Sequence, residues 1–148
     1  MTSSKNWALI ESTEMITTEE KKLLLLVDDD PVNIHVVHSI LKDDYKIRVA
    51  TNGAKALDLA KTEPLPDLIL LDVMMPEMDG YEATRAIRRQ QNDRNKTAIV
   101  ALTANARDED RARCVAAGMD DFITKPLDLA QLADCLAKWA ALSPVGRL

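Results

Sequence analysis

Apolar and polar residues follow one another along this chain in blocks of two kinds. Short apolar runs such as Leu23–Val27 and Leu68–Leu71 contain no polar residue. Runs of this length without alternation are typical of strands that are buried on both faces of a sheet. Longer stretches between them carry apolar residues three and four positions apart, which is typical of helices with one buried face. The expected strands are 23–27, 46–51, 68–71, 97–102 and 121–124.

Polar residues and prolines indicate where the helices begin. Asp30 and Pro31 predict a helix N-cap and first turn, because an Asp side chain accepts the free N–H groups there and proline has none to satisfy. This helix is expected to run to about Lys42, with its inward face formed by Val36, Val37, Ile40 and Leu41. The remaining helices are expected after Asn52, after Asp79, over residues 106–117 and after Asp128.

Strand and helix therefore alternate five times along the chain. Connections of this length predict right-handed crossovers, and hence an α/β doubly wound domain whose parallel sheet carries helices on both faces. We expect this single domain over residues 22–141. Residues 1–21 are polar and acidic and are expected to form a flexible N-terminal extension, with a short C-terminal tail over 142–148.

Composition narrows the functional classes. The formal net charge of −5 argues against binding of nucleic acid through a broad positively charged surface. The longest apolar run, Leu23–Val27, is too short to span a membrane, and the first residues lack the apolar core of a secretory signal. Cys114 and Cys135 have no metal-type spacing, so we expect reduced packing cysteines in a cytoplasmic protein. The four glycines are too scattered for a nucleotide-binding loop.

Two groups of polar residues are expected to lie on the surface without a specific role. His35 and His38 fall on the first helix and are interpreted as surface histidines. A local basic run is interpreted as a solvated helix face. Its members are Arg85, Arg88, Arg89, Arg94 and Lys96.

Polar side chains follow four of the predicted strands at their carboxyl ends. Asp28 and Asp29 follow the first strand, and Asp72, Thr103 and Lys125 follow the third, fourth and fifth. Because the carboxyl ends of parallel strands share one edge of the sheet, these groups should converge in one crevice. Clustered carboxylates repel one another, and oxygen-only ligands at an open site favour Mg²⁺. The lysine and the threonine add the donors that a phosphoryl group needs, and an aspartate can attack phosphorus to give an aspartyl-phosphate.

With their flanking residues, these positions resemble the response-regulator receiver domains of two-component signalling. The matching segments are Leu-Val-Asp-Asp-Asp-Pro-Val-Asn, Leu-Leu-Asp-Val-Met-Met-Pro-Glu-Met-Asp-Gly, Val-Ala-Leu-Thr-Ala and Phe-Ile-Thr-Lys-Pro-Leu, in this order. The resemblance extends from residue 22 to about residue 141. It implies a flavodoxin-like fold with the strand order 2-1-3-4-5, either as a stand-alone receiver or as the receiver of a hybrid histidine kinase.

Carried over position by position, the resemblance implies a phosphoacceptor and a metal site. Asp72 would be the phosphoacceptor. Asp29 and Asp72 would bind Mg²⁺ directly, together with the backbone carbonyl of Met74. Asp28 would act on the ion through a water molecule.

The resemblance implies further roles near the phosphoryl group. Thr103 would hydrogen-bond that group, and Lys125 would pair with Asp72 at rest and with a phosphoryl oxygen afterwards. The Lys125–Pro126 peptide bond would be cis. Phe122 matches the position of an aromatic switch residue, with a passively packed phenylalanine as the alternative.

The function implied is a phosphorelay signalling switch rather than an enzyme with a separate substrate. A histidine kinase or a histidine phosphotransfer protein would donate the phosphoryl group. The signal would pass to a protein effector through the face formed by residues 106–117, residues 121–124 and the last helix. The same face would also serve a homodimer, and neither nucleic acid nor membrane is expected as a partner.

Two other functions compete with this interpretation. A phosphatase of the haloacid-dehalogenase type also uses an Asp nucleophile with Mg²⁺, but it needs a second Asp two positions later, where this chain has Met74. A pseudo-receiver, a binding scaffold that phosphorylation does not regulate, would be expected to lack at least one of the five site residues. All five are present. The scaffold remains the alternative function, because an intact site does not prove its use.

Overall fold

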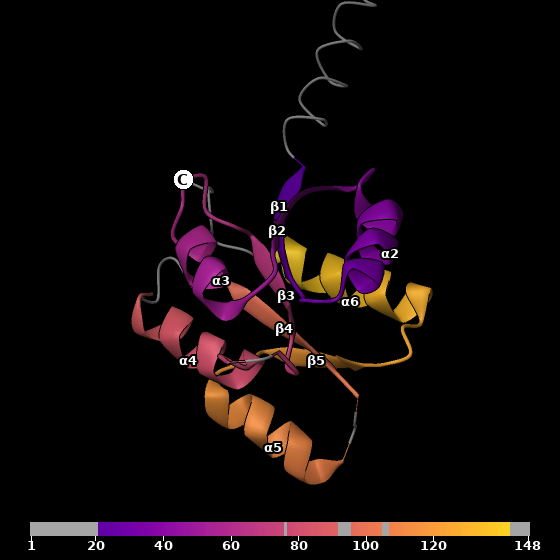
Figure 1. Ribbon diagram of the computed structural model, residues 1–148. Helices are drawn as coiled ribbons and strands as arrows, with labels where there is room; N and C mark the ends of the chain where they lie inside the picture. Colours follow the sequence, from indigo (N-terminus) through magenta and orange to yellow (C-terminus); the bar gives the residue numbers. More distant parts are fainter. Residues whose placement is uncertain (1–20, 76, 92–95, 105–106, 143–148) are drawn as a thin grey trace, which may run out of the picture.

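The computed structural model describes residues 21–75, 77–91, 96–104 and 107–142. Within these ranges, strands and helices alternate from β1 to α6 (Figure 1). The strands are β1 (Lys22–Val27), β2 (Tyr45–Ala50), β3 (Leu68–Asp72), β4 (Ala98–Thr103) and β5 (Asp121–Thr124). The helices are α2 (Pro31–Leu41), α3 (Gly53–Ala60), α4 (Gly80–Arg89), α5 (Asp108–Ala117) and α6 (Leu129–Ala141). Each expected strand and helix is therefore present, with ends within two residues of those expected, although the start expected at residue 106 lies outside the described residues.

The strands form one parallel sheet in the order β2-β1-β3-β4-β5. The chain starts in the middle of the sheet, moves to one edge with β2, and then crosses β1 to add β3, β4 and β5 on the other side. This reversal is the topological switch point of a doubly wound sheet. The predicted flavodoxin-like α/β fold with strand order 2-1-3-4-5 is confirmed.

The two faces of the sheet bury two separate apolar cores. Alternate residues of the central strands, such as Leu25 and Ile69, pack on one face against α3, α4 and α5. Their neighbours Leu24 and Leu70 pack on the other face against α2 and α6. Figure 1 shows these two sets of helices on opposite sides of the sheet. Because both faces are covered, the central strands β1, β3 and β4 carry no polar residue in alternation, which explains their continuous apolar runs, whereas the edge strand β2 does alternate with Lys46 and Arg48.

Side-chain caps fix the start of most helices. The side chains of Asp30, Asn52, Asp79 and Asp128 accept backbone N–H groups in the first turns of α2, α3, α4 and α6. Helix α5 differs, because its N-cap residue Arg107 makes no side-chain cap hydrogen bond. Acidic residues in the first turn of α5 interact favourably with the positive end of the helix dipole instead.

The inward face of α2 is narrower than the sequence suggested. Val37 and Leu41 are buried, whereas Val36 is 40% exposed. The expectation that Val36 faces inward is wrong. Neighbouring residues of a helix point about 100° apart, so when Val37 points at the sheet, Val36 points away from it.

Arg88 departs most clearly from its expected surface position. Its guanidinium donates to the carbonyl oxygens of Thr97 (2.6 Å) and Gly118 (2.8 Å) and to Asp120 Oδ2 (2.7 Å). Only 16% of its side chain is exposed, so the prediction of a solvated side chain is wrong here. Arg88 instead joins the end of α4 to the start of β4 and to the turn before β5. Of the other basic residues, Arg85, Arg89 and Lys96 are exposed, and Arg94 lies outside the described residues.

The remaining expectations concern the cysteines, the chain ends and membranes. Cys114 is buried, Cys135 is half-buried, and both are free thiols. In the described part of the chain, no helix is long and apolar enough to cross a membrane. Residues 1–20 and 143–148 lie outside the described ranges, so the predicted extension, tail and domain boundaries stay predictions, as does the cytoplasmic location.

Gly80→Ala should destabilise the protein and displace the loop after β3. A Cβ atom at Gly80 would lie 2.6 Å from Val73 Cα and 2.7 Å from the carbonyl oxygen of Asp72. Backbone atoms cannot turn aside as the end of a side chain can, so the cost should be about 1–3 kcal/mol in urea unfolding.

Gly53→Ala is the matched control for this variant. Its Cβ would meet only side-chain atoms of Met78, with Sδ at 2.6 Å, Cγ at 2.8 Å and Cβ at 2.9 Å, and because a side chain can rearrange more readily than backbone, the loss should be smaller. Equal losses for the two variants, or an unchanged Gly80→Ala protein, would contradict a tight backbone contact at Gly80.

Candidate functional site

The carboxyl ends of four strands bring the predicted site residues to one edge of the sheet. Asp28 and Asp29 follow β1, Asp72 ends β3, Thr103 ends β4 and Lys125 follows β5. Carboxylate oxygens of the three aspartates all lie within 4.8 Å of one another. The three aspartates therefore lie close together, as expected for the carboxyl ends of parallel strands. Lys125 lies beside them because it pairs with Asp72.

Asp72 is held by contacts to both of its carboxylate oxygens. Lys125 Nζ lies 3.3 Å from Oδ2, and the backbone N–H of Met74 donates to Oδ1 at 3.0 Å. The residue is 3% exposed. These contacts fix the carboxylate at the bottom of the crevice, with a cation beside it that is only partly buried.

Asp28 is the most deeply buried carboxylate of the cluster. The residue is fully buried, and while Oδ1 accepts the backbone N–H of Asp30 at 2.9 Å, Oδ2 accepts no hydrogen bond from a described group. Burial raises the pKa of Asp28 to about 6. The hydrogen bond from Asp30 acts against this rise, and the negative charge of Asp72 adds to it.

These features fit a hard divalent cation. A buried carboxylate oxygen without a hydrogen bond is an available ligand, and every donor of the cluster is a carboxylate oxygen, as Mg²⁺ prefers. Asp29 is exposed, which leaves the mouth of the site open to the waters that Mg²⁺ retains. His35 and His38 are exposed on α2 and take no part in the cluster. The role of the Met74 carbonyl as a further ligand stays a prediction.

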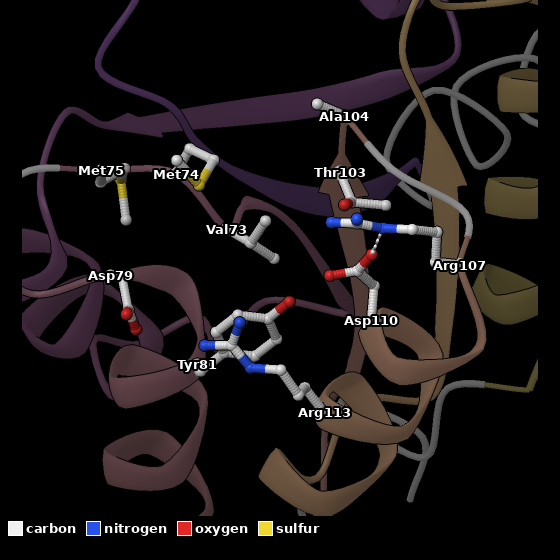
Figure 2. A pocket seen from close by; sticks show the side chains of 10 residues that line it. All are labelled: Val73, Met74, Met75, Asp79, Tyr81, Thr103, Ala104, Arg107, Asp110 and Arg113. Atoms are coloured by element: carbon white, nitrogen blue, oxygen red, sulfur yellow. Dashed lines mark hydrogen bonds and ion pairs between the residues drawn. The ribbon is translucent and has the colours of Figure 1, made fainter.

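A cavity of about 600 Å³ opens beside Thr103, between the loop that follows β3 and helix α5 (Figure 2). Thr103 itself is 4% exposed. Figure 2 shows Arg107 next to it, in contact with Asp110 at 3.2 Å. At another part of the lining the guanidinium of Arg113, an exposed residue, lies over the Tyr81 ring, 4.4 Å from its centroid. The cavity leaves space in which the loop and the start of α5 can move relative to each other.

The last two predicted features lie on β5 and after it. Phe122 is half-buried and packs against the core under α3, α4 and α5. The Lys125–Pro126 peptide bond is cis, the geometry that the resemblance implied. Glu63–Pro64 is also cis, which the sequence analysis did not predict.

Contacts of two side chains around β5, one on each face of the sheet, were missed by sequence reasoning. Arg111 on α5 lies over the Phe122 ring, with Cζ 4.9 Å from the centroid. Asp121 Oδ2 accepts the indole N–H of Trp139 at 2.9 Å, which joins β5 to α6. No pattern along the chain signals these contacts, because each joins separate elements whose relative position is set by the packing of the whole domain.

Asp28→Asn should stabilise the metal-free protein. The rise in pKa from 3.8 to about 6 corresponds to a cost on the order of 2–3 kcal/mol for keeping a charged carboxyl buried. In wild type this cost is present above the folded pKa and disappears as the pH falls toward the unfolded pKa. Urea unfolding with a chelator should therefore show the gain at about pH 7.5 and little gain at about pH 4.

Mg²⁺ should stabilise wild type and have much less effect on Asp28→Asn. Asp30→Asn is the matched control, because it removes the same charge from an exposed neighbour and Asn caps a helix as well as Asp. The idea fails if Asp28→Asn gains nothing over the control near neutral pH, or if its gain is undiminished in acid.

Comparison with known proteins agrees with this geometry. The family model of the response regulator receiver domain matches residues 24–137. The sensor histidine kinase GacS of Pseudomonas protegens is 42% identical over 119 residues, which are 78% of this chain and 13% of GacS. The chain thus spans only a small part of the length of this relative.

Two solved structures are also similar. The receiver domain of the sensor histidine kinase PA1611 from Pseudomonas aeruginosa, with a magnesium ion in its active-site cleft, has 39% identity and a TM-score of 0.71, covering 81% of this chain and 98% of that one. The complex of the Saccharomyces cerevisiae phosphotransfer protein Ypd1 with the receiver domain of Ssk1 matches with 28% identity and a TM-score of 0.75, covering 82% and 90%. This chain belongs to the response-regulator receiver-domain family, whose members act as signalling switches in two-component systems.

Proposed function

We propose that this chain is a phosphorelay switch that accepts a phosphoryl group on Asp72 in a Mg²⁺-dependent reaction. The observation that carries the proposal is the surroundings of Asp72, which lies 3.3 Å from Lys125 and in one cluster with Asp28 and Asp29. The donor is a histidine kinase or a histidine phosphotransfer protein. The receiver domain of Ssk1, which has the same fold, is solved in complex with such a phosphotransfer protein.

The transfer is a displacement at phosphorus. One carboxylate oxygen of Asp72 forms a bond to the phosphorus of the donor's phosphohistidine while the phosphorus–nitrogen bond breaks, and the imidazole leaves with the electron pair and takes up a proton from water. The Lys125 ammonium then pairs with a phosphoryl oxygen, and the Thr103 hydroxyl donates to another. Asp29, Asp72 and the Met74 carbonyl would hold Mg²⁺ directly, and Asp28 through a water molecule. The bound ion would supply positive charge that offsets the repulsion of the carboxylates and the charge of the phosphoryl group.

A protein donor is favoured by an apolar rim around the charged site. Val32 in the first turn of α2 is 68% exposed, Met74 after β3 is 71% exposed, and Leu129 at the start of α6 is 50% exposed. Apolar side chains exposed around a functional centre are typical of docking surfaces. A donor protein that covers this apolar rim (Val32, Met74 and Leu129) would bring its histidine to the buried Asp72.

The output is proposed to pass through the face formed by α5, β5 and α6, either to a protein effector or to a second copy. The path begins at Thr103, whose carbonyl oxygen accepts the backbone N–H of Lys125 at 2.8 Å. Through this hydrogen bond, a movement of Thr103 toward a phosphoryl group would displace the backbone at the end of β5. This is the strand that carries Phe122. Two arrangements of this face, selected by phosphorylation, would constitute the switch.

Beryllofluoride, which imitates an acyl phosphate on aspartate, tests the proposal most directly. With Mg²⁺ it should produce saturable amide chemical-shift changes that extend from Asp72 to Thr103 and Phe122. The changes should be absent in Asp72→Asn and in wild type with a chelator. A wild-type protein that shows no Mg²⁺-dependent response would contradict the switch and leave the scaffold function.

Val32→Glu should separate docking from chemistry. A charge on the apolar rim should slow phosphorylation by phospho-Ypd1, used as a protein donor, at least about tenfold. The rate with acetyl phosphate, which needs no docking surface, should stay within about twofold. Val115→Glu is the matched control, because Val115 is 72% exposed in the last turns of α5. Equal slowing with both donors, or by both variants, would argue against docking on the rim.

A further inference from the structure

Phe122 is the single phenylalanine of the chain, and its ring is covered by a cation. The guanidinium of Arg111, which projects from α5, lies 4.9 Å from the ring centroid. Within the described residues, no ion pair involves Arg111. The Phe122 ring is therefore the partner of this guanidinium within the described residues, and the contact joins an exposed cation to a half-buried ring.

The backbone that carries Phe122 is firmly held, so a movement at this position concerns the side chain. Asp121 Oδ1 accepts the backbone N–H of Phe122 at 2.9 Å. The other oxygen of Asp121 accepts the indole N–H of Trp139 at 2.9 Å, which ties the start of β5 to α6. The ring can turn about its side-chain bonds while the strand stays in place.

The sheet beside Phe122 carries small side chains in the direction of the functional site. Phe122 is in register with Ala101, and Thr124 with Thr103, so these side chains share one face of the sheet. Ala101 is small and places no bulky group next to the ring. An inward turn therefore carries the ring along this face toward the region of Thr103, whose movement toward a phosphoryl group would make the necessary room.

We propose that Arg111 is a positioning residue that holds the Phe122 ring in its outward, half-buried orientation and so opposes the switch. This inference rests on the proposed function of Asp72. A guanidinium cannot follow the ring inward without losing its hydration, which is costly for an unpaired charge. The contact is thus present in the resting state and lost in the switched state, and only such a difference between states can shift their equilibrium.

The strength of the effect follows from the nature of the contact. A cation over an aromatic ring at an exposed site is worth about 0.5–1 kcal/mol, which corresponds to about a two- to fivefold change in the ratio of the two ring orientations. By linkage, Arg111 weakens the response to a phosphoryl group at Asp72 by the same factor. Arg111 acts here through Phe122 and touches neither the metal site nor the phosphoryl site.

The single phenylalanine makes the ring directly observable. Protein grown with 4-fluorophenylalanine carries one ¹⁹F reporter, at Phe122. Arg111→Met keeps an apolar side chain but removes the charge. Without Mg²⁺ and beryllofluoride, the ¹⁹F resonance of this variant should lie closer than that of wild type to the resonance of beryllofluoride-bound wild type. Titration with beryllofluoride in saturating Mg²⁺ should give a midpoint about two- to fivefold lower than in wild type. Arg111→Lys keeps a cation at this position, so its ¹⁹F resonance and its titration midpoint should both lie close to the wild-type values.

Lys138→Met is the matched control. It removes the same charge from a cation that lies 5.0 Å from another ring, that of Trp139, and should leave the Phe122 resonance and the midpoint at their wild-type values. If wild type responds to beryllofluoride but Arg111→Met has the midpoint of wild type or of Lys138→Met, the inference is wrong and the proposed function stands. If wild type gives no Mg²⁺-dependent response, the proposed function fails and the inference falls with it.

Discussion

An excess of negative charge, two of its three carboxylates buried, lies at one edge of the sheet, and the remainder of the fold has to accommodate it. Three carboxylates have oxygens within 4.8 Å of one another, and a single ammonium lies beside them, 3.3 Å from Asp72. Burial raises the pKa of Asp28 to about 6, so the charged form of this one carboxyl is disfavoured in the folded protein. A fold of ordinary stability sustains such a site only because the remaining sheet and both cores are apolar and closely packed. The same imbalance means that a group bringing positive charge or hydrogen-bond donors would be stabilised at this site.

The backbone around Asp72 converts this charge cluster into a defined geometry. Gly80 begins α4 so close to β3 that a Cβ atom would lie 2.6 Å from Val73 Cα, and the Gly80 N–H donates to the Val73 carbonyl oxygen at 3.1 Å. The loop between them is thereby folded back against the strand end. The N–H of Met74 reaches Asp72 Oδ1 as part of the same turn. Because Gly80 has no side chain, the strand end and the start of α4 can approach closely enough for the Asp72 carboxylate to accept a hydrogen bond from its own loop.

The two edges of the sheet are held in different ways, which bears on how a local change could spread. At the amino edge, Arg88 joins α4, β4 and the turn before β5 through hydrogen bonds of 2.6–2.8 Å. At the carboxyl edge, α5 starts without a side-chain cap and borders on a cavity of about 600 Å³ beside Thr103. The fixed edge maintains the register of the strands. The open edge is where charge and hydrogen bonding are unbalanced, so we expect structural change to concentrate there.

The sequence by itself determined the elements and the residues of the site. Unbroken apolar runs that end in Asp28, Asp72 and Thr103 are local signals, and parallel strands must bring such ends to one edge. The strand order came from family resemblance, because hydrophobic periodicity does not distinguish neighbouring strands. Only the tertiary structure decided the burial of Arg88, the exposure of Val36 and the position of Arg111 over Phe122. Each depends on how a helix lies against the sheet, and Arg88 meets Asp120 across 32 positions of the chain. Local patterns carry no information about contacts of that kind, because they arise from the packing of elements that are distant in sequence.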